Sequence, residues 1–350
     1  MTHGGDVWQG GAPEDWLDFS ANVRPEGAPD WVRRALMEGL DEARYYPDVQ
    51  MRRARAAMAQ YLGAPERFVC PTAGGIGAID LAARMQSAGN VIFTPCFSEY
   101  QARAQGRAPI RKASLLCGRH MVGEPAEQAN GALFEGCAVW LSNPLNPVGT
   151  AFTRAQILSL LERVEKMRGW LIVDEAFIAY CPGYTALPLV EAHERLIVVG
   201  SMTKILGIPG VRLGYICAQP QTLNKLTERQ LPWELNCFAN AVACALPANA
   251  ARIERDARQA VRRRASLCAM LSQLGLFVYP GQAPFILADL GRAAAPVARR
   301  LRERKILVRE CMDFEGVDDG RHLRLAVKDT DSNLRFIQCL REALTCAENV

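Results

Sequence analysis

One lysine of the sequence has the surroundings of an amine nucleophile. Lys204 directly follows a predicted buried strand in the segment SMTKILGIPGVRLGY, residues 201–215. A lysine in a confined, partly desolvated site has a lowered pKa and can form a Schiff base. Ser201 and Arg212 supply a hydroxyl and a guanidinium, the donors that a phosphate dianion binds. The segment therefore predicts a Schiff-base lysine beside a phosphate site, with a solvated surface lysine as the alternative.

A carboxylate and a carboxamide follow two other predicted strands. Asp174, in LIVDEAF, ends a strand at the edge where open α/β sheets bind ligands. Its carboxylate could keep a pyridinium nitrogen protonated, so that a pyridine ring withdraws electrons, or it could only start a turn. Asn146, in SNPLNPVGT, lies in a turn that two Asn-Pro steps and a glycine fix. Turn formation alone would explain that motif, but the amide could also donate to a phenolic oxygen on a bound ring.

A glycine-rich turn precedes a predicted helix in CPTAGGIGAIDLAARM. Backbone N–H groups and the positive end of the helix dipole meet at Gly74 and Gly75, which makes an anion site. The turn lacks the lysine of a P-loop, and its glycines do not fit the dinucleotide-binding pattern. By itself it indicates an anion and no particular ligand.

These residues need a sheet that brings the ends of several strands together. We expect a mostly parallel sheet covered by helices on both faces, because short apolar strands alternate with helical patterns. A capping box of Thr153 and Gln156 starts the helix Gln156–Met167. The expected strands are Arg67–Cys70, Asn90–Thr94, Ala138–Ser142, Trp170–Asp174, Leu196–Gly200 and Leu213–Cys217.

The two ends of the chain predict a smaller α+β domain, which agrees with the roughly two domains expected for 350 residues. A long Arg-rich helix is expected after about Pro247, and the helix Asp30–Ala43 is expected to pack with this domain. Because the net charge is only +4, we interpret the arginines as a solvated helix face, with a nucleic-acid patch as the alternative. The expected strands here lie near Leu276–Tyr279, Phe285–Ala288, Ile306–Arg309 and His322–Val327.

The twelve cysteines and four histidines do not have the spacing of a metal site, since no CxxC pair occurs. Most of the cysteines have apolar neighbours, so we interpret them as packing residues of a reduced, cytoplasmic protein. No apolar run is long enough for a membrane helix, and the first residues do not resemble a signal peptide. Composition therefore favours no nucleic-acid or membrane partner and no metal.

Taken in order, the motifs resemble the fold-type I pyridoxal-phosphate enzymes of the aspartate aminotransferase superfamily over nearly the whole chain. The family pattern of Asn-Pro-x-Gly, Asp-x-Ala-aromatic and Ser-x-x-Lys with a later Arg is met by Asn146–Gly149, Asp174–Phe177 and Ser201–Arg212. The resemblance implies a large cofactor-binding domain over 45–245. It also implies a small domain from 1–44 and 246–350, with an N-terminal arm over the active site.

The resemblance also implies a role for individual residues. Lys204 would bind pyridoxal 5'-phosphate covalently and shuttle protons, Asp174 would pair with the pyridine nitrogen, and Asn146 would bond the ring oxygen. Phe97 would stack on the ring, and Arg324 would bind the substrate carboxylate; a core phenylalanine and an exposed strand arginine are the alternatives. The expected phosphate ligands are Gly74, Gly75, Ser201, Arg212 and, from the neighbouring subunit of a homodimer, Tyr46.

Two positions depart from the family pattern. Phe177 stands where a tyrosine often bonds the ring oxygen, and Gly75 and Ile76 stand where the phosphate loop often carries Ser or Thr. Fewer hydroxyl donors leave backbone N–H groups to hold more of the phosphate. We expect cofactor binding to survive both changes.

Several segments resemble one subgroup, the threonine-phosphate decarboxylases of cobalamin biosynthesis, which are close to the histidinol-phosphate aminotransferases. They are HGGDV, LDFSANVRP, PCFSEY, ILVRECMDFEG and HLRLAVK. His3 could bond a substrate phosphate, although a frayed terminus is the alternative, and Asn22 would lie near the substrate. The resemblance implies decarboxylation of L-threonine O-3-phosphate to (R)-1-amino-2-propanol O-2-phosphate. The alternatives are L-serine O-phosphate as substrate, an aminotransferase of the histidinol-phosphate type, and a cofactor-binding regulator without catalysis.

Overall fold

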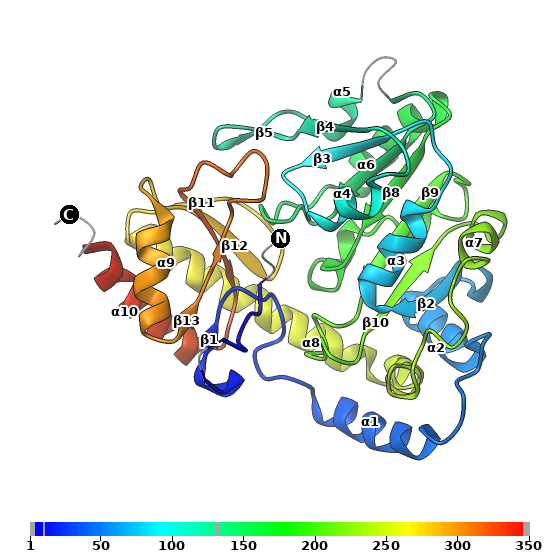
Figure 1. Cartoon of the computed structure of the whole chain (residues 1–350), viewed down its shortest axis with the longest axis horizontal. Helices are drawn as coiled ribbons and strands as arrows, with labels where there is room; N and C mark the ends of the chain where they lie inside the picture. The colour runs from blue at the N-terminus through cyan, green and yellow to red at the C-terminus, as the bar shows by residue number, and fades with distance from the viewer. Residues whose placement is uncertain (1–3, 10, 130–133, 346–350) are drawn as a thin grey trace.

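A seven-stranded sheet forms the centre of the computed structural model, which describes residues 4–9, 11–129 and 134–345 (Figure 1). The strand order is β2-β10-β9-β8-β7-β3-β4. Strand β10 runs antiparallel to both of its neighbours, and the other pairs are parallel, so the expected mostly parallel sheet is confirmed. The bounds are Val69–Ala73 (β2), Asn90–Thr94 (β3), Ile110–Ser114 (β4), Ala138–Ser142 (β7), Trp170–Asp174 (β8), Leu196–Ser201 (β9) and Leu213–Cys217 (β10).

The first of these strands lies further along the chain than the sequence analysis expected. The prediction began at Arg67, but residues Glu66–Phe68 form a short 3-10 helix after Pro65, and β2 runs from Val69 to Ala73. The apolar alternation alone could not locate this turn. The shift places the end of β2 directly before the glycine-rich turn.

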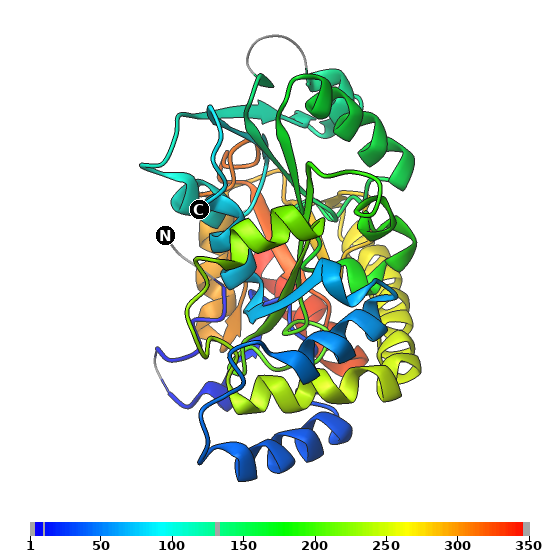
Figure 2. The ribbon, with the colours of Figure 1, turned by 90° about the vertical axis from the view of Figure 1, so that its right-hand side faces the viewer.

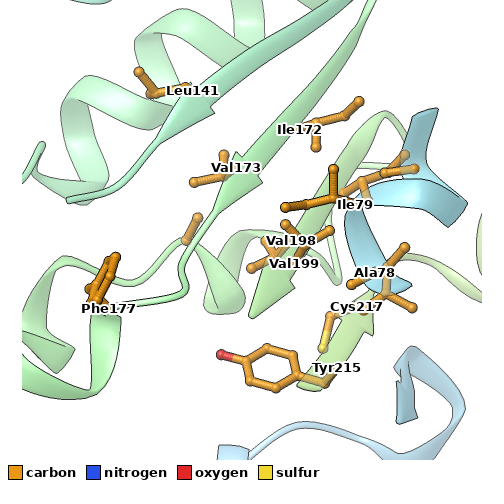
Figure 3. Packing of buried hydrophobic residues seen from close by; sticks show 14 of the residues in the cluster. Ala78, Ile79, Leu141, Ile172, Val173, Phe177, Val198, Val199, Tyr215 and Cys217 are labelled. Carbon is orange, nitrogen blue, oxygen red and sulfur yellow. The ribbon is translucent and has the colours of Figure 1, made fainter. Parts of the chain in front are cut away.

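Helices cover the large sheet, and two of them begin at motifs that the sequence analysis identified as helix starts. Helix α3 (Gly74–Ala83) begins directly at the glycine-rich turn, and Figure 3 shows its Ala78 and Ile79 among the apolar side chains that pack with β9. Helix α6 (Arg154–Lys166) begins at the predicted capping box, because the Thr153 hydroxyl accepts from the Gln156 N–H at 3.3 Å. The remaining helices on this side are α2 (Arg52–Leu62), α4 (Glu99–Ala104), α5 (Pro125–Gln128) and α7 (Pro220–Thr227).

A second, antiparallel sheet of four strands lies apart from the first and has its own apolar core (Figure 1). Its order is β11-β12-β15-β14. A parallel pair joins the N-terminal segment to this half, since β1 (Leu17–Asp18) lies beside β13 (Ile306–Leu307). The other bounds are Phe277–Val278 (β11), Phe285–Asp289 (β12), Arg309–Glu310 (β14), His322–Ala326 (β15), Ala294–Glu303 (α9) and Thr330–Thr345 (α10).

Helix α8 (Cys237–Gln273) runs past both sheets. It begins ten residues before Pro247, so the prediction of a start after that proline was wrong. The Asn236 side chain caps the helix by accepting from the Ala239 N–H at 2.8 Å, and Pro247 lies inside it. A proline within a helix removes one backbone hydrogen bond without ending the helix when tertiary packing holds both sides. None of the helices in the described ranges is long and apolar enough to cross a membrane.

Helix α1 (Asp30–Glu42) packs along the first half of α8 (Figure 2). The approach is close at Gly39, where an added Cβ would lie 3.1 Å from the Ala241 Cβ. The division into 45–245 and 1–44 with 246–350 stays a prediction. Its second boundary falls within α8, which both parts would share.

Candidate active site

A cavity of about 430 Å³ lies where the carboxyl ends of the large-sheet strands face β15 and the N-terminal segment. It brings together most of the residues that the sequence analysis proposed, although they come from seven separate segments. Gly74 lies at its edge beside Arg212. The proposed residues that line it are Asn22, Gly75, Phe97, Asn146, Asp174, Ser201, Lys204, Arg212 and Arg324.

Lys204 projects into this cavity from the turn that follows β9. The turn is held by backbone hydrogen bonds, from Leu206 to Met202 at 3.2 Å and from Ile208 to Thr203 at 3.1 Å. Burial lowers the pKa of Lys204 to about 8, with smaller contributions from nearby guanidinium charges. An amine with this pKa is partly neutral at physiological pH, as a nucleophile or proton carrier must be.

Asp174 ends β8 and is buried inside the cavity. One carboxylate oxygen accepts from the Ala176 N–H at 2.8 Å, and the other accepts from the Tyr100 hydroxyl at 2.5 Å. Burial raises the pKa of Asp174, and the hydrogen bond from Tyr100 opposes that rise most strongly. No lysine or arginine of the described ranges forms an ion pair with this carboxylate, so it can receive a cationic group of a ligand.

Glycines keep open the end of the cavity where the sequence analysis expects a phosphate. The N-cap residue Ala73 has no side-chain oxygen, so nothing on that side chain competes for the first N–H groups of α3. A Cβ on Gly75 would lie 3.2 Å from the Ser201 Cβ, and one on Gly74, where φ is +74°, would lie 2.5 Å from Arg212 Nη2. Hydroxyl, guanidinium and backbone donors around this space fit the phosphate of pyridoxal phosphate.

Arg324 on β15 is a buried cation that faces the same cavity. Its Nη1 donates to Asn146 Oδ1 at 2.9 Å and its Nη2 to the Ser20 carbonyl at 2.8 Å. Its Nε and the Asn22 Oδ1 are buried without a hydrogen-bond partner in the described part of the chain. Burial lowers the pKa of Arg324 to about 10. Because buried charges need partners, this geometry supports a site for an anionic ligand.

Tyr100 and Thr203 are site residues that the sequence analysis missed. Thr203 lines the cavity and shares a 2.8 Å hydrogen bond with Ser201. Tyr100 lies behind the cavity, and its ring meets the Phe97 ring edge-on at 6.0 Å. Both residues lie within motifs that the sequence analysis quoted for other residues, PCFSEY and SMTK. The sequence alone did not show which residues they would contact, so no role was assigned to them.

The N-terminal segment reaches the cavity at Gly4. The Gly5 N–H donates to the Ser20 hydroxyl at 2.8 Å, and a Cβ on Gly4 would lie 2.2 Å from the Ser20 carbonyl oxygen, so only glycine fits there. His3, which was expected to contact a substrate phosphate, lies outside the described residues. Its role stays a prediction.

Tyr46 does not line the cavity of its own chain. It is 83% exposed, and its ring lies tilted against that of Trp233 with the ring centres 4.9 Å apart. The expected role, in which a second copy receives it, stays a prediction. The two departures, Ile76 and Phe177, both line the cavity, and the Phe177 ring meets Phe285 edge-on at 5.0 Å.

None of the eleven cysteines in the described ranges forms a disulfide. The two near the site are Cys70, which is fully buried, and Cys96, which is half-buried. Burial raises the pKa of both thiols, that of Cys96 to about 12. Thiols in this state are poor nucleophiles, which supports a packing role.

Comparisons with known proteins identify the family of the chain. The family model described as aminotransferase class I and II matches residues 14–339. A threonine-phosphate decarboxylase from Salmonella typhimurium is 32% identical, with 98% of this chain and 97% of that protein covered.

Two solved structures share the fold. The histidinol-phosphate aminotransferase from Clostridium acetobutylicum has a TM-score of 0.86 at 25% identity, covering 93% of this chain and 98% of that one. The L-threonine-O-3-phosphate decarboxylase from Porphyromonas gingivalis has a TM-score of 0.83 at 24% identity, covering 93% and 99%. These matches confirm the expected fold-type I architecture. By its sequence and its fold, the chain belongs to the aminotransferase class I and II family.

Proposed function

We propose that the protein is a pyridoxal-phosphate-dependent carboxy-lyase that converts L-threonine O-3-phosphate to (R)-1-amino-2-propanol O-2-phosphate in cobalamin biosynthesis. The observation that carries the proposal is the near full-length similarity to the Salmonella typhimurium threonine-phosphate decarboxylase. The arrangement of Lys204, Asp174 and Arg324 around one cavity supports it, because an amine, a buried carboxylate and a buried guanidinium are the groups that this chemistry uses.

Each part of the cavity would hold one part of the cofactor. Pyridoxal phosphate, when bound, withdraws electrons from a bond at the substrate Cα. Asp174 would hold the proton on the ring nitrogen, Asn146 would donate to the ring oxygen, and Phe97 would lie against the ring face. The residues assigned to the cofactor phosphate are Gly74, Gly75, Ser201, Arg212 and, from a second copy, Tyr46.

The choice between decarboxylation and amino transfer depends on which Cα bond stands perpendicular to the ring. Arg324 would bind the substrate carboxylate, His3 would bond the substrate phosphate, and Asn22 would lie near the substrate. Binding a remote phosphate can fix the pose in which the bond to the carboxylate breaks and carbon dioxide leaves. Lys204 would then supply the proton that Cα takes up.

We infer that the protein acts as a homodimer. Large apolar side chains are exposed in two segments that meet where Tyr46 contacts Trp233, and a second copy of this chain would cover them. The exposed residues of these segments are Met37, Leu40, Tyr45, Tyr46, Val49, Leu231 and Trp233. Sedimentation should give a dimer, and Tyr46→Phe should weaken cofactor retention without changing the dimer. We also infer a cytoplasmic location, because the cysteines of the described ranges form no disulfides.

One assay separates the candidate activities. Purified protein with pyridoxal phosphate should release carbon dioxide from L-threonine O-3-phosphate without forming a keto acid, and more slowly from L-serine O-phosphate. Glutamate-dependent formation of pyridoxamine phosphate would instead establish an aminotransferase, the alternative that the similarity to the Clostridium acetobutylicum structure keeps open. Lys204→Ala should abolish the visible absorbance of the bound cofactor. Cofactor binding without turnover of any of these substrates would favour a regulator.

A further inference from the structure

Tyr100 makes a specific contact with Asp174, a carboxylate that lines the cavity. It lies in the first turn of α4 and is 1% exposed. Its hydroxyl donates to Asp174 Oδ2 at 2.5 Å, while Asp174 Oδ1 accepts from the Ala176 N–H. Each oxygen of the carboxylate therefore has one donor from the protein, and the remaining lone pairs can receive a ligand.

The ring of Tyr100 is held on two sides. It stacks on Trp140 with ring centres 5.4 Å apart, and the Trp140 Nε1 donates to Asn90 Oδ1 at 3.0 Å. On its other side it meets Phe97 edge-on. Because the ring cannot turn without disturbing these contacts, the hydroxyl stays directed at Asp174.

Tyr100 also links two proposed contacts of the cofactor ring. Phe97 lies just before α4 and Tyr100 lies within it, so this one turn of chain positions both side chains. Phe97 would touch the face of the ring, and Asp174 would meet its nitrogen. A single helix turn would therefore fix the ring plane relative to its proton partner.

The hydrogen bond affects the charge state of Asp174, because this carboxyl group is buried and has no ion pair in the described ranges. Burial favours the neutral carboxyl, and a hydroxyl donor favours the carboxylate. The Tyr100 contact leads the effects that oppose burial. Without it the carboxylate would be a stronger base and would take the proton from a bound pyridinium.

We propose that Tyr100 is a positioning residue: its hydroxyl keeps Asp174 ionised and directed at the ring nitrogen of the cofactor. The proposal rests on the proposed function only in requiring that the cavity binds pyridoxal phosphate. The identity of the substrate does not enter it.

The test uses Tyr100→Phe, which removes the hydroxyl and keeps the ring stacking. With pyridoxal phosphate labelled with ¹⁵N at the ring nitrogen, we expect the NMR resonance of the bound cofactor to move toward the unprotonated position, in the direction of Asp174→Asn. The kcat should fall about tenfold to hundredfold, the range for a hydrogen bond to a charged group, while KM stays within about threefold.

Tyr279→Phe is the matched control. Tyr279 is also a buried tyrosine, 2% exposed, whose hydroxyl has one hydrogen bond, to His322 at 3.1 Å in the small sheet. It should leave the ¹⁵N resonance unchanged. A Tyr100→Phe resonance that coincides with that of the parent would overturn the proposal, whatever happens to kcat. Failure of the decarboxylase assay would not affect this readout, because the resonance is measured without substrate.

Discussion

Two buried aspartates end strands of the two sheets, and they differ in whether a cationic side chain of the protein binds them. Asp174 ends β8 and Asp289 ends β12, and both are almost inaccessible. Asp289 accepts from Arg119 Nε at 2.8 Å, lies 2.7 Å from Arg119 Nη2 and accepts from the Gly291 N–H at 2.8 Å. Asp174 has hydrogen bonds but, within the described ranges, no such cation.

The consequence appears in their acidities. Burial by itself would raise the pKa of Asp289, but the Gly291 N–H and the Arg119 guanidinium more than offset it, so the pKa is lowered. For Asp174 burial prevails and the pKa is raised. The ion pair of Asp289 with Arg119 holds the turn between β5 (Leu116–Cys117) and β6 (His120–Met121) against the small sheet. A carboxylate left without a cation is available to a ligand.

The largest effect should come from Asp174→Asn. The amide cannot hold a proton on the ring nitrogen, so we expect kcat to fall by about a thousandfold or more, the scale for losing an electrostatic catalytic group. The thermal stability of the protein without cofactor should stay equal or rise, because a buried, unpaired charge is removed. Steady-state kinetics and calorimetry test the two parts, and a marked loss of stability would contradict the contrast.

Asp289→Asn should have the reverse pattern. It leaves Arg119 without its buried partner, and we expect unfolding free energy to fall by about 2 kcal/mol, below the usual range for buried pairs because Arg119 is 43% exposed. kcat should stay within about threefold, since no reacting atom is touched. Glu254→Gln, which breaks the exposed pair with Arg258 on α8, is the control and should cost about 0.5 kcal/mol or less. Equal urea midpoints for the two variants would contradict this.

Glu175, the neighbour of Asp174, extends the contrast to pH. Its carboxylate accepts from the Thr185 hydroxyl and the Ala186 N–H, and burial raises its pKa from 4.5 to about 7. An acid with a raised pKa contributes stability below its unfolded value and loses that contribution as pH rises through the folded value. At about 1.4 kcal/mol per pH unit, the contribution falls by about 3 kcal/mol between these values.

Glu175→Gln should therefore remove this pH dependence. Urea unfolding of the parent and the variant across that window should give a difference that moves in favour of the variant as pH rises. Asp289 has the opposite sign, because its lowered pKa contributes stability at neutral pH that is lost in acid. A Glu175→Gln curve parallel to the parent's would show that the carboxyl titrates normally.

The smallest expected effect is the pH dependence of the reaction between the Lys204 amine and the cofactor. Because the pKa of Lys204 is lowered to about 8, its neutral fraction should rise about tenfold from one unit below that value to one unit above it. The rate at which the cofactor-free protein combines with pyridoxal phosphate should follow the same curve, measured by stopped-flow absorbance. A midpoint near the ordinary lysine value of 10.5 would contradict the placement of Lys204 in a desolvated site.

The sequence predicted the strands best where they are buried on both faces. The bounds of β3, β7, β8 and β10 are those expected, since a short, continuous apolar run between turn residues is typical of a central strand. The direction of β10 was not specified, although only residues 202–212 join it to β9. A parallel crossover needs a dozen residues or more, so this connection favours an antiparallel strand.

The pair Tyr100–Asp174 could not be predicted in the same way. These residues are 74 positions apart, and their contact depends on how α4 follows β3 and on where β8 ends. Several site motifs were visible because they lie at or just after the end of a strand, as Gly74, Asp174 and Lys204 do. The buried, unpartnered state of Arg324 Nε and Asn22 Oδ1 within the described ranges was not visible, since it depends on what the surrounding segments leave uncovered.

Helix α8 has a consequence for how the molecule comes apart. Its buried residues near Ala239 belong to the core of the large sheet, and Leu267 and Leu271 belong to the core of the small sheet. Thirty-seven residues of helix span about 55 Å, so one rod is anchored in both cores. Unfolding of either core would remove the contacts that hold one part of this helix. The packing of the rest of the helix against the other core would then be weakened. The two halves should therefore denature in a single cooperative transition, and a chain severed between residues 245 and 246 should yield two fragments that fold only together.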